Sequence, residues 1–224
     1  MSKDKEICYY CGGPATSKEH IPPKAFFPND FREQLFTVPS CDEHNGLKSK
    51  DDEYVKVVLT RSADLMLRED LQLVKEKSEK SVSRSPAFRA KVELNPEPAA
   101  IILPNGNVIP TLSHEIDLER IFGFFGSLAR GLYFHHEGEV WNGKISVAPH
   151  FLIRDDAEQE DIEKNEELLA FFDRDDSHGV NKNVFYYNFV YIQDDDHVWT
   201  GACILAICLF DKFKISLVMR PYKN

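Results

Sequence analysis

The chain has 224 residues, of which 42% are hydrophobic and 29% charged, and its formal net charge is −10. This apolar fraction is enough to build a core, so the composition excludes a wholly disordered protein. No stretch approaches the roughly 18–20 apolar residues that a membrane span needs, and no apolar segment of the signal-peptide type follows the first six residues. We therefore expect a soluble protein of the cytoplasm.

Most of the negative charge lies in one segment. Residues 155–176 hold eleven acidic and two basic side chains, whereas the remaining 202 residues carry 25 Lys/Arg against 26 Asp/Glu. Residues 75–91 reverse the bias, with six basic side chains against two acidic ones. The net charge therefore does not exclude a nucleic-acid partner. The acidic segment is typical of a solvated face, and the alternatives are a surface that repels nucleic acid or one that docks a basic partner.

The predicted elements follow an irregular region, residues 1–50, that is rich in proline, glycine and polar turns. Ser49 or Asp51 can cap a first helix that runs to residue 65 or 67, and amphipathic spacing predicts a second helix over residues 71–80. The serine-rich residues 81–86 contain a proline and are typical of a linker or a domain boundary.

The second half of the chain predicts a mixture of helices and strands. Asn105-Gly106 between two apolar runs predicts a hairpin over residues 99–112, and apolar residues at i, i+3, i+4 and i+7 predict a helix over residues 116–135. The other expected elements are a short strand at 150–153, a solvated helix through the acidic segment to 172, and strands at 184–192 and 199–218.

These elements predict an α+β fold in three parts. We expect a small zinc-stabilised module at residues 1–65, a helical and basic connector at 66–98, and a larger mixed α+β accessory domain at 99–224, for which the sequence indicates no role.

The five cysteines form two groups. Cys203 and Cys208 lie in an apolar run, where thiols act as small hydrophobic side chains. The other three belong to two short pairs with metal-ligand spacing, Cys8-x-x-Cys11 and Cys41-x-x-His44. Thiolates and an imidazole at these spacings predict a tetrahedral Cys3His site for a structural zinc ion. The alternatives are a redox CxxC, which no βαβ pattern supports, or two unrelated cysteine groups.

Three polar residues adjoin these pairs. Glu19 and His20 lie between them, and Asn45 directly follows the second pair. If zinc draws the pairs together, we expect these side chains to lie close. Carboxylate and amide oxygens suit a hard divalent cation, and an imidazole with a pKa of about 6.5 can take a proton from water at neutral pH. The alternatives are an exposed loop histidine at His20 and a turn residue at Asn45, before Gly46.

The two metal-ligand pairs and these three polar residues make seven positions in a fixed order. In these positions, over about residues 5–60, the chain resembles the HNH, or ββα-metal, endonuclease family of the zinc-knot type. The resemblance implies a hairpin followed by a helix and a zinc ion that takes no part in the chemistry. It implies His20 as the general base and a phosphate contact from the segment that begins at Lys48. It also implies that Glu19 and Asn45 are the ligands of a catalytic Mg²⁺ or Mn²⁺ ion.

Two positions depart from the family pattern. Glu19 stands where an aspartate is usual, and Phe36 stands where an asparagine usually braces the loop. Either Gln34 substitutes for this asparagine or the brace is absent.

The resemblance implies metal-dependent hydrolysis of DNA phosphodiester bonds to 5′-phosphate products, and the family alone suggests bacterial or phage defence as the setting. The expected partners are DNA and a protein that supplies DNA engagement, because an acidic surface is unusual for a free-standing nuclease. The alternative function is a zinc-knot module that binds nucleic acid or protein without catalysis. Taken singly, Lys48 and Lys50 are more typical of a solvated face, and the basic residues 75–91 are either a linker or a DNA contact.

Overall fold

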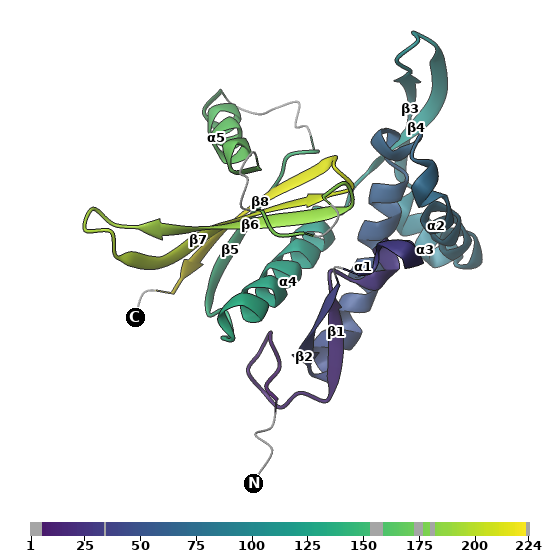
Figure 1. Cartoon of the computed structure of the whole chain (residues 1–224). Helices are drawn as coiled ribbons and strands as arrows, with labels where there is room; N and C mark the ends of the chain where they lie inside the picture. Colours follow the sequence, from purple (N-terminus) through teal and green to yellow (C-terminus); the bar gives the residue numbers. More distant parts are fainter. Residues whose placement is uncertain (1–5, 34, 153–158, 173–176, 180–181, 223–224) are drawn as a thin grey trace.

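The computed structural model describes residues 6–33, 35–152, 159–172, 177–179 and 182–222. The fold is α+β, as predicted: two separate hairpins and a four-stranded antiparallel sheet are combined with five α-helices (Figure 1). The strands are β1 (Ser17–Ile21), β2 (Phe36–Ser40), β3 (Leu94–Ile102), β4 (Val108–Glu115), β5 (Gly143–Pro149), β6 (Phe185–Gln193), β7 (Trp199–Leu209) and β8 (Phe213–Pro221). The α-helices are α1 (Asp42–Thr60), α2 (Gln72–Arg84), α3 (Pro86–Val92), α4 (Leu118–Glu137) and α5 (Gln159–Leu169). No helix in this part of the chain is long and apolar enough to cross a membrane.

The N-terminal region is a hairpin followed at once by a helix. Strands β1 and β2 pair antiparallel, with Glu19 opposite Val38 and His20 opposite Thr37. Helix α1 begins at Asp42, with Cys41 as its N-cap residue, and ends at Thr60. The predicted start at Ser49 or Asp51 was therefore wrong, because the first turns carry Gly46 and polar side chains and show no apolar periodicity. The order of elements is the ββα order that the resemblance implies.

The prediction of a linker at residues 81–86 was also wrong. Helix α2 continues to Arg84, and α3 begins at Pro86 after a single residue. Ser85 is the N-cap of α3, and its Oγ accepts a hydrogen bond from the amide of Phe88 at 3.2 Å. Serine and proline here mark a helix start and not a boundary, because serine caps a helix and proline is tolerated in its first turn. The basic residues 75–91 are therefore helical.

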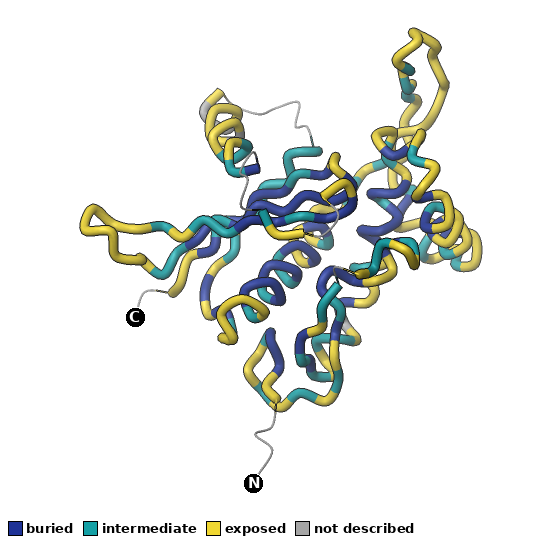
Figure 2. The backbone as a smooth tube through the Cα atoms, in the orientation of Figure 1, coloured by how far each residue is buried: buried dark blue, intermediate teal, exposed yellow. Residues whose placement is uncertain are grey.

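The hairpin predicted at 99–112 is confirmed and is longer, since it comprises β3 and β4. Gly106 adopts a φ of +83° in its turn, which favours glycine. Most of the hairpin is exposed, and it projects from the body of the molecule beside α2 and α3 (Figures 1 and 2).

The four-stranded sheet has the order β5-β8-β7-β6 and lies between α4 on one face and α5 on the other (Figure 1). Cys203 belongs to the buried set that faces the main core, whereas Cys208 packs with Ala206 against Phe172 on the α5 side. Both thiols are buried, as expected from their apolar surroundings. Because the second half of β7 is covered on both faces, its sequence from residue 202 onward is continuously apolar and does not alternate.

One strand prediction in this region was wrong. Residues 150–152 form a turn, and the strand that pairs with β8 is β5, which ends at Pro149. Gly143 begins β5 because a Cβ there would lie 2.3 Å from the carbonyl oxygen of Arg220, so only glycine permits this pairing. Of the acidic segment, residues 159–172 form α5 and a short 3-10 turn, and its other residues lie outside the described part of the chain.

The N-terminal and C-terminal regions share one hydrophobic core. A single cluster of buried side chains extends from Tyr9 and Ile21 through α1 and α4 to the sheet. Helix α4 approaches β1 closely, since a Cβ on Gly131 would lie 2.6 Å from Cδ1 of Ile21. The boundaries at 65 and 98 stay a prediction, and α4 is the element that joins the hairpin to the sheet.

Candidate metal centre and the two faces of the hairpin

Four side chains from two distant segments meet at the start of α1. Cys8 and Cys11 come from the N-terminal loop, Cys41 is the N-cap of α1, and His44 lies one turn into that helix. Their ligand atoms all lie within 4.8 Å of one another. His44 Nδ1 is 3.0 Å from the Cys41 sulfur and 3.9 Å from the Cys8 sulfur. This cluster can hold a metal ion, and its donor set is compatible with a zinc knot.

The local sequence builds the loop that presents the first pair. The amide of Cys8 donates to the carbonyl of Gly13 at 2.7 Å, and the amide of Gly12 donates to the carbonyl of Cys8 at 2.9 Å. Gly12 has a φ of +72°, a conformation that glycine adopts without strain. The amide of Tyr9 donates to the carbonyl of Pro39 at 2.9 Å, which holds the loop against the end of β2 next to Cys41.

The imidazole of His44 is oriented by aromatic packing. The ring of Tyr10 stacks on it with centroids 4.3 Å apart, and the guanidinium of Arg130, from α4, lies 5.0 Å from the Tyr10 ring on which it packs. These contacts fix the ring plane of His44, which positions Nδ1 toward the sulfur atoms.

The face of the hairpin that packs on α1, here called the inner face, carries Ser17, Glu19 and Ile21. Glu19 is 7% exposed, and both of its carboxylate oxygens already accept hydrogen bonds. One oxygen accepts from the ammonium of Lys48, and the other accepts from the hydroxyl of Tyr9 at 3.0 Å. Burial and the neighbouring Glu19 carboxylate raise the pKa of Tyr9, so this hydroxyl stays protonated and keeps donating.

Lys48 points inward and not toward solvent. It is 6% exposed, it pairs with Glu19, and its Nζ lies 3.8 Å from a carboxylate oxygen of Asp52, one turn further along α1. Burial raises the pKa of Asp52 to about 7; Lys48 opposes this shift, and the charges of Glu19 and Asp51 add to it. At neutral pH a buried Glu19–Lys48 ion pair thus lies beside a carboxyl group whose raised pKa favours its protonated form.

Asn45 ties α1 to β1. Its side-chain amide donates to the hydroxyl of Ser17 at 3.0 Å, and that hydroxyl in turn donates to the carbonyl of Ser40 at 3.2 Å. Ser17 and Glu19 lie two residues apart on the inner face, so Asn45 and Glu19 face the same side of the hairpin.

His20 lies on the opposite, outer face of the hairpin, because successive side chains of a strand alternate. The imidazole is partly exposed, and within the described ranges it has no hydrogen bond or ion pair. Burial lowers the pKa of His20, and the nearby cations Lys24 and Arg32 lower it further, while Glu19 acts in the other direction. The ring is therefore held neutral and able to accept a proton at neutral pH.

The structure thus brings together the four predicted zinc ligands, and it places Glu19 and Asn45 on one face with His20 on the other. The catalytic roles of these three residues stay predictions. Phe36, at the position of the usual brace, stacks its ring on His135 with centroids 3.7 Å apart, and Gln34 lies outside the described residues.

A divalent ion does not fit at Glu19 in this arrangement. Both carboxylate oxygens have protein donors, and the Lys48 ammonium already supplies the positive charge next to them. A second cation at this point would face strong repulsion from Lys48 in a buried environment.

Sequence reasoning missed four residues of these two faces. Asp52 could have been found, since it is one helical turn from Lys48, and Tyr9 lies within the CxxC pair itself. Lys24 and Arg32 gave no signal, because the loop that brings them to His20 has no regular spacing.

The wider comparisons add no relative to this description. No family model, no curated protein and no solved structure matches the chain.

Proposed function

We propose that the chain is an HNH-type endonuclease that hydrolyses phosphodiester bonds in DNA, with a structural Zn²⁺ ion in the Cys3His cluster and His20 as the general base. The observation that carries this proposal is the placement of a neutral imidazole, without a bonded partner among the described residues, on the strand next to that cluster and beside Lys24 and Arg32. A base that must accept a proton and a substrate that carries negative charge both suit such a place.

Zinc is the ion that this donor set favours. Three thiolates and one imidazole complete a tetrahedral shell, which leaves no open position for substrate and gives the ion a structural role. When bound, the ion joins the N-terminal loop to the first turn of α1 and so fixes the hairpin against the helix.

In the proposed reaction His20 accepts a proton from a water molecule. The water oxygen forms a bond to phosphorus while the bond from phosphorus to the 3′ oxygen breaks, which leaves a 5′-phosphate and, after protonation, a 3′-hydroxyl. Lys24 and Arg32 supply positive charge next to the phosphate, which stabilises the charge that develops on its oxygens.

The resemblance also implies a catalytic Mg²⁺ or Mn²⁺ ion. Because Glu19 is saturated by Lys48 and Tyr9, the proposal gives Glu19 and Asn45 the role of holding the hairpin on α1, and no step is routed through an ion at Glu19. A positioning role for this pair is distinct from catalysis, and the two can be separated by mutation.

The second candidate function is a zinc-knot module that binds nucleic acid or protein without catalysis. The observation that favours it is the same Glu19–Lys48 pair, which leaves the hairpin without the acidic ligand that the family uses.

The test is nicking of supercoiled plasmid by the purified full chain, with Mg²⁺ or Mn²⁺ and with EDTA. We expect His20→Ala to lower the rate about 10²–10⁴-fold, with zinc content unchanged, and added imidazole to restore part of it. The matched control is Thr37→Ala, because Thr37 pairs with His20 on the same face and should be dispensable. Absence of nicking by the wild-type chain in every condition would favour the binding module.

A further inference from the structure

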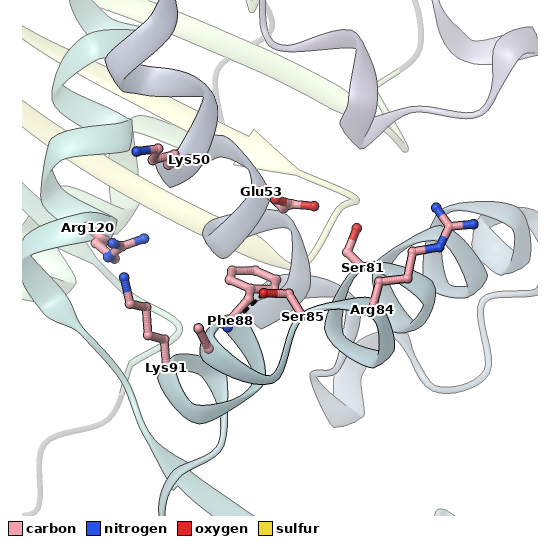
Figure 3. Close-up of a pocket in the computed structure, with 9 residues that line it drawn as sticks. Lys50, Glu53, Ser81, Arg84, Ser85, Phe88, Lys91 and Arg120 are labelled. Carbon is pink, nitrogen blue, oxygen red and sulfur yellow. Dashed lines mark hydrogen bonds between the residues drawn. The ribbon is translucent and has the colours of Figure 1, made fainter.

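A pocket of about 450 Å³ lies between α1, the end of α2, α3 and the start of α4 (Figure 3). Each of these four helices contributes one cation: Lys50, Arg84, Lys91 and Arg120 respectively. Arg84 and Lys91 belong to the basic stretch 75–91, and Lys50 follows the second zinc-ligand pair. None of these three residues has a role in the proposed chemistry.

The acidic side chains that line the pocket are too few to neutralise its cations. Its lining contains one carboxylate, Glu53. Arg120 is paired with Asp51 at 3.4 Å and with Asp117 at 3.2 Å. In the described part of the chain, no ion pair involves Lys50, Arg84 or Lys91.

Other arginines of the same helical region do find partners. Arg61 binds Glu79 at 2.8 Å and Glu93 at 3.1 Å, and Arg68 binds Asp70 at 2.6 Å. Outside residues 155–176 the chain still carries 26 Asp/Glu against 25 Lys/Arg, so carboxylates are as numerous as cations. Lys50, Arg84 and Lys91 line one pocket and lack an ion pair within the described residues, which points to an anionic ligand and not to a shortage of partners.

The side chains are arranged to receive such a ligand. Lys50, Lys91 and Arg120 reach from three helices into the same side of the pocket, and Figure 3 shows their charged ends facing one another. The hydroxyls of Ser81 and Ser85 line the other side. Ser85 Oγ uses one lone pair to accept from the amide of Phe88 at 3.2 Å, so its hydrogen remains available to a ligand oxygen.

We propose that this pocket binds a phosphate group. The ammonium groups of Lys50 and Lys91, which have no ion pair within the described residues, and the two serine hydroxyls are donors that phosphate oxygens accept from readily. As a phosphate of a DNA strand, the ligand would extend the substrate contact, and this source rests on the proposed function. As a phosphate of a free nucleotide, it would be independent of that function.

The pocket shares helix α1 with the second zinc-ligand pair. Lys50 follows His44 by six residues on α1, which corresponds to about 9 Å along the helix axis. A phosphate held at Lys50 would therefore lie less than two helical turns along α1 from the zinc ligand His44.

The experiment measures binding by the full chain carrying His20→Ala, so that cleavage cannot interfere. The ligands are a labelled DNA oligonucleotide, followed by fluorescence anisotropy, and pyrophosphate, followed by calorimetry. The pocket variant is Lys50→Ala with Lys91→Ala. The control variant is Lys80→Ala with Arg89→Ala, which removes the same charge from exposed positions on α2 and α3 that do not line the pocket.

We expect the pocket variant to weaken binding at least tenfold, while the control changes affinity less than threefold. The pocket variant should also reduce the slope of log affinity against log salt by about one for each phosphate that it no longer neutralises. Weaker binding of DNA alone identifies a strand phosphate, and weaker binding of pyrophosphate as well identifies a free phosphate ligand. Equal weakening by both variants, no change in either, or binding of an acidic peptide in preference to both ligands would overturn the proposal.

The two proposals fail separately. A loss of affinity in the pocket variant supports the phosphate site even when the wild-type chain nicks no plasmid. Conversely, nicking that depends on His20 stands even when the pocket variant binds DNA normally. Zinc content and circular dichroism of each variant establish that the exposed substitutions leave the fold intact.

Discussion

The two faces of the N-terminal hairpin use neighbouring residues for opposite purposes. On the inner face Glu19 is buried and both of its oxygens accept hydrogen bonds, whereas on the outer face His20 is partly exposed with no bonded partner among the described residues. A strand turns consecutive side chains to opposite sides, so an acidic–histidine dipeptide cannot by itself bring both groups to one point. Glu19 thus has the surroundings of a residue that holds the hairpin on α1, whereas the surroundings of His20 are compatible with the general-base role that we propose.

Removing a ligand of the metal cluster should have the largest effect on folding, because the cluster anchors the hairpin and therefore both of its faces. We expect Cys8→Ser and Cys41→Ser each to abolish binding of one zinc per chain and to unfold the N-terminal region, since structural zinc sites contribute about 10–16 kcal/mol of apparent binding free energy. Elemental analysis and circular dichroism measure this, with Cys208→Ala as a control that keeps its zinc. Wild-type protein with less than about half an equivalent of zinc, and both serine variants folded normally, would contradict it.

Breaking the inner pair should have the next largest effect. Lys48→Met leaves the Glu19 carboxylate buried without its cation, and removal of one partner of a buried pair costs about 3–5 kcal/mol. The exposed Lys50→Met on the same helix is the matched control and should change the free energy of unfolding by less than about 0.5 kcal/mol. Urea unfolding monitors both, and equal stability of the two variants would show that the pair is not an inner-face brace.

The carboxyl group of Asp52 should make stability depend on pH. Its pKa rises from 3.8 in the unfolded chain to about 7 in the folded protein, so the folded state holds the proton more tightly. This contribution is complete below pH ~4 and is lost as the pH rises from about 4 to about 7, with a total on the order of 4 kcal/mol for a shift of about three pKa units. Asp52→Asn should flatten the pH dependence of the unfolding free energy between pH ~4 and ~8. An unchanged profile in Asp52→Asn would remove Asp52 from the network.

Removing a cation near His20 on the outer face should have the smallest effect, a shift in the pH dependence of the cleavage rate. Because the pKa of His20 is lowered, the rate should fall only when the pH drops below about 6.5. Lys24→Ala removes a cation that disfavours the imidazolium, so it should raise the pKa of His20 and move the acidic limb of the rate profile to higher pH. Lys18→Ala removes a lysine that pairs with Glu6, and it should leave the limb in place.

The metal pairs and the main secondary structure could be predicted from the sequence because their signals are local. CxxC and CxxH spacing, the Asn-Gly turn and the apolar periodicity of α4 each depend on a few neighbouring residues. The start of α1 could not be predicted, because its first turns are polar and are stabilised by the hairpin and by Asn45. The strand β5 was missed because Gly143 is needed for contact with β8, a partner that lies far away in sequence.

The candidate site shows the same limit. The sequence identifies Glu19, His20 and Asn45 as polar residues near a metal knot, but the pairing of Glu19 with Lys48 depends on how the helix docks on the strand. Which face a residue occupies therefore decides its role, and adjacency in the sequence does not.

The measurement that tests this account most directly is the plasmid-nicking rate of the double variant Glu19→Gln/Lys48→Met beside that of His20→Ala. The double variant removes both charges of the inner pair and leaves neither unpaired, so a brace can be replaced at modest cost. We predict that it cleaves within about tenfold of the wild type, whereas His20→Ala loses about 10²–10⁴-fold. Loss of cleavage by the double variant with recovery at raised Mg²⁺, or wild-type cleavage by His20→Ala, would contradict the account.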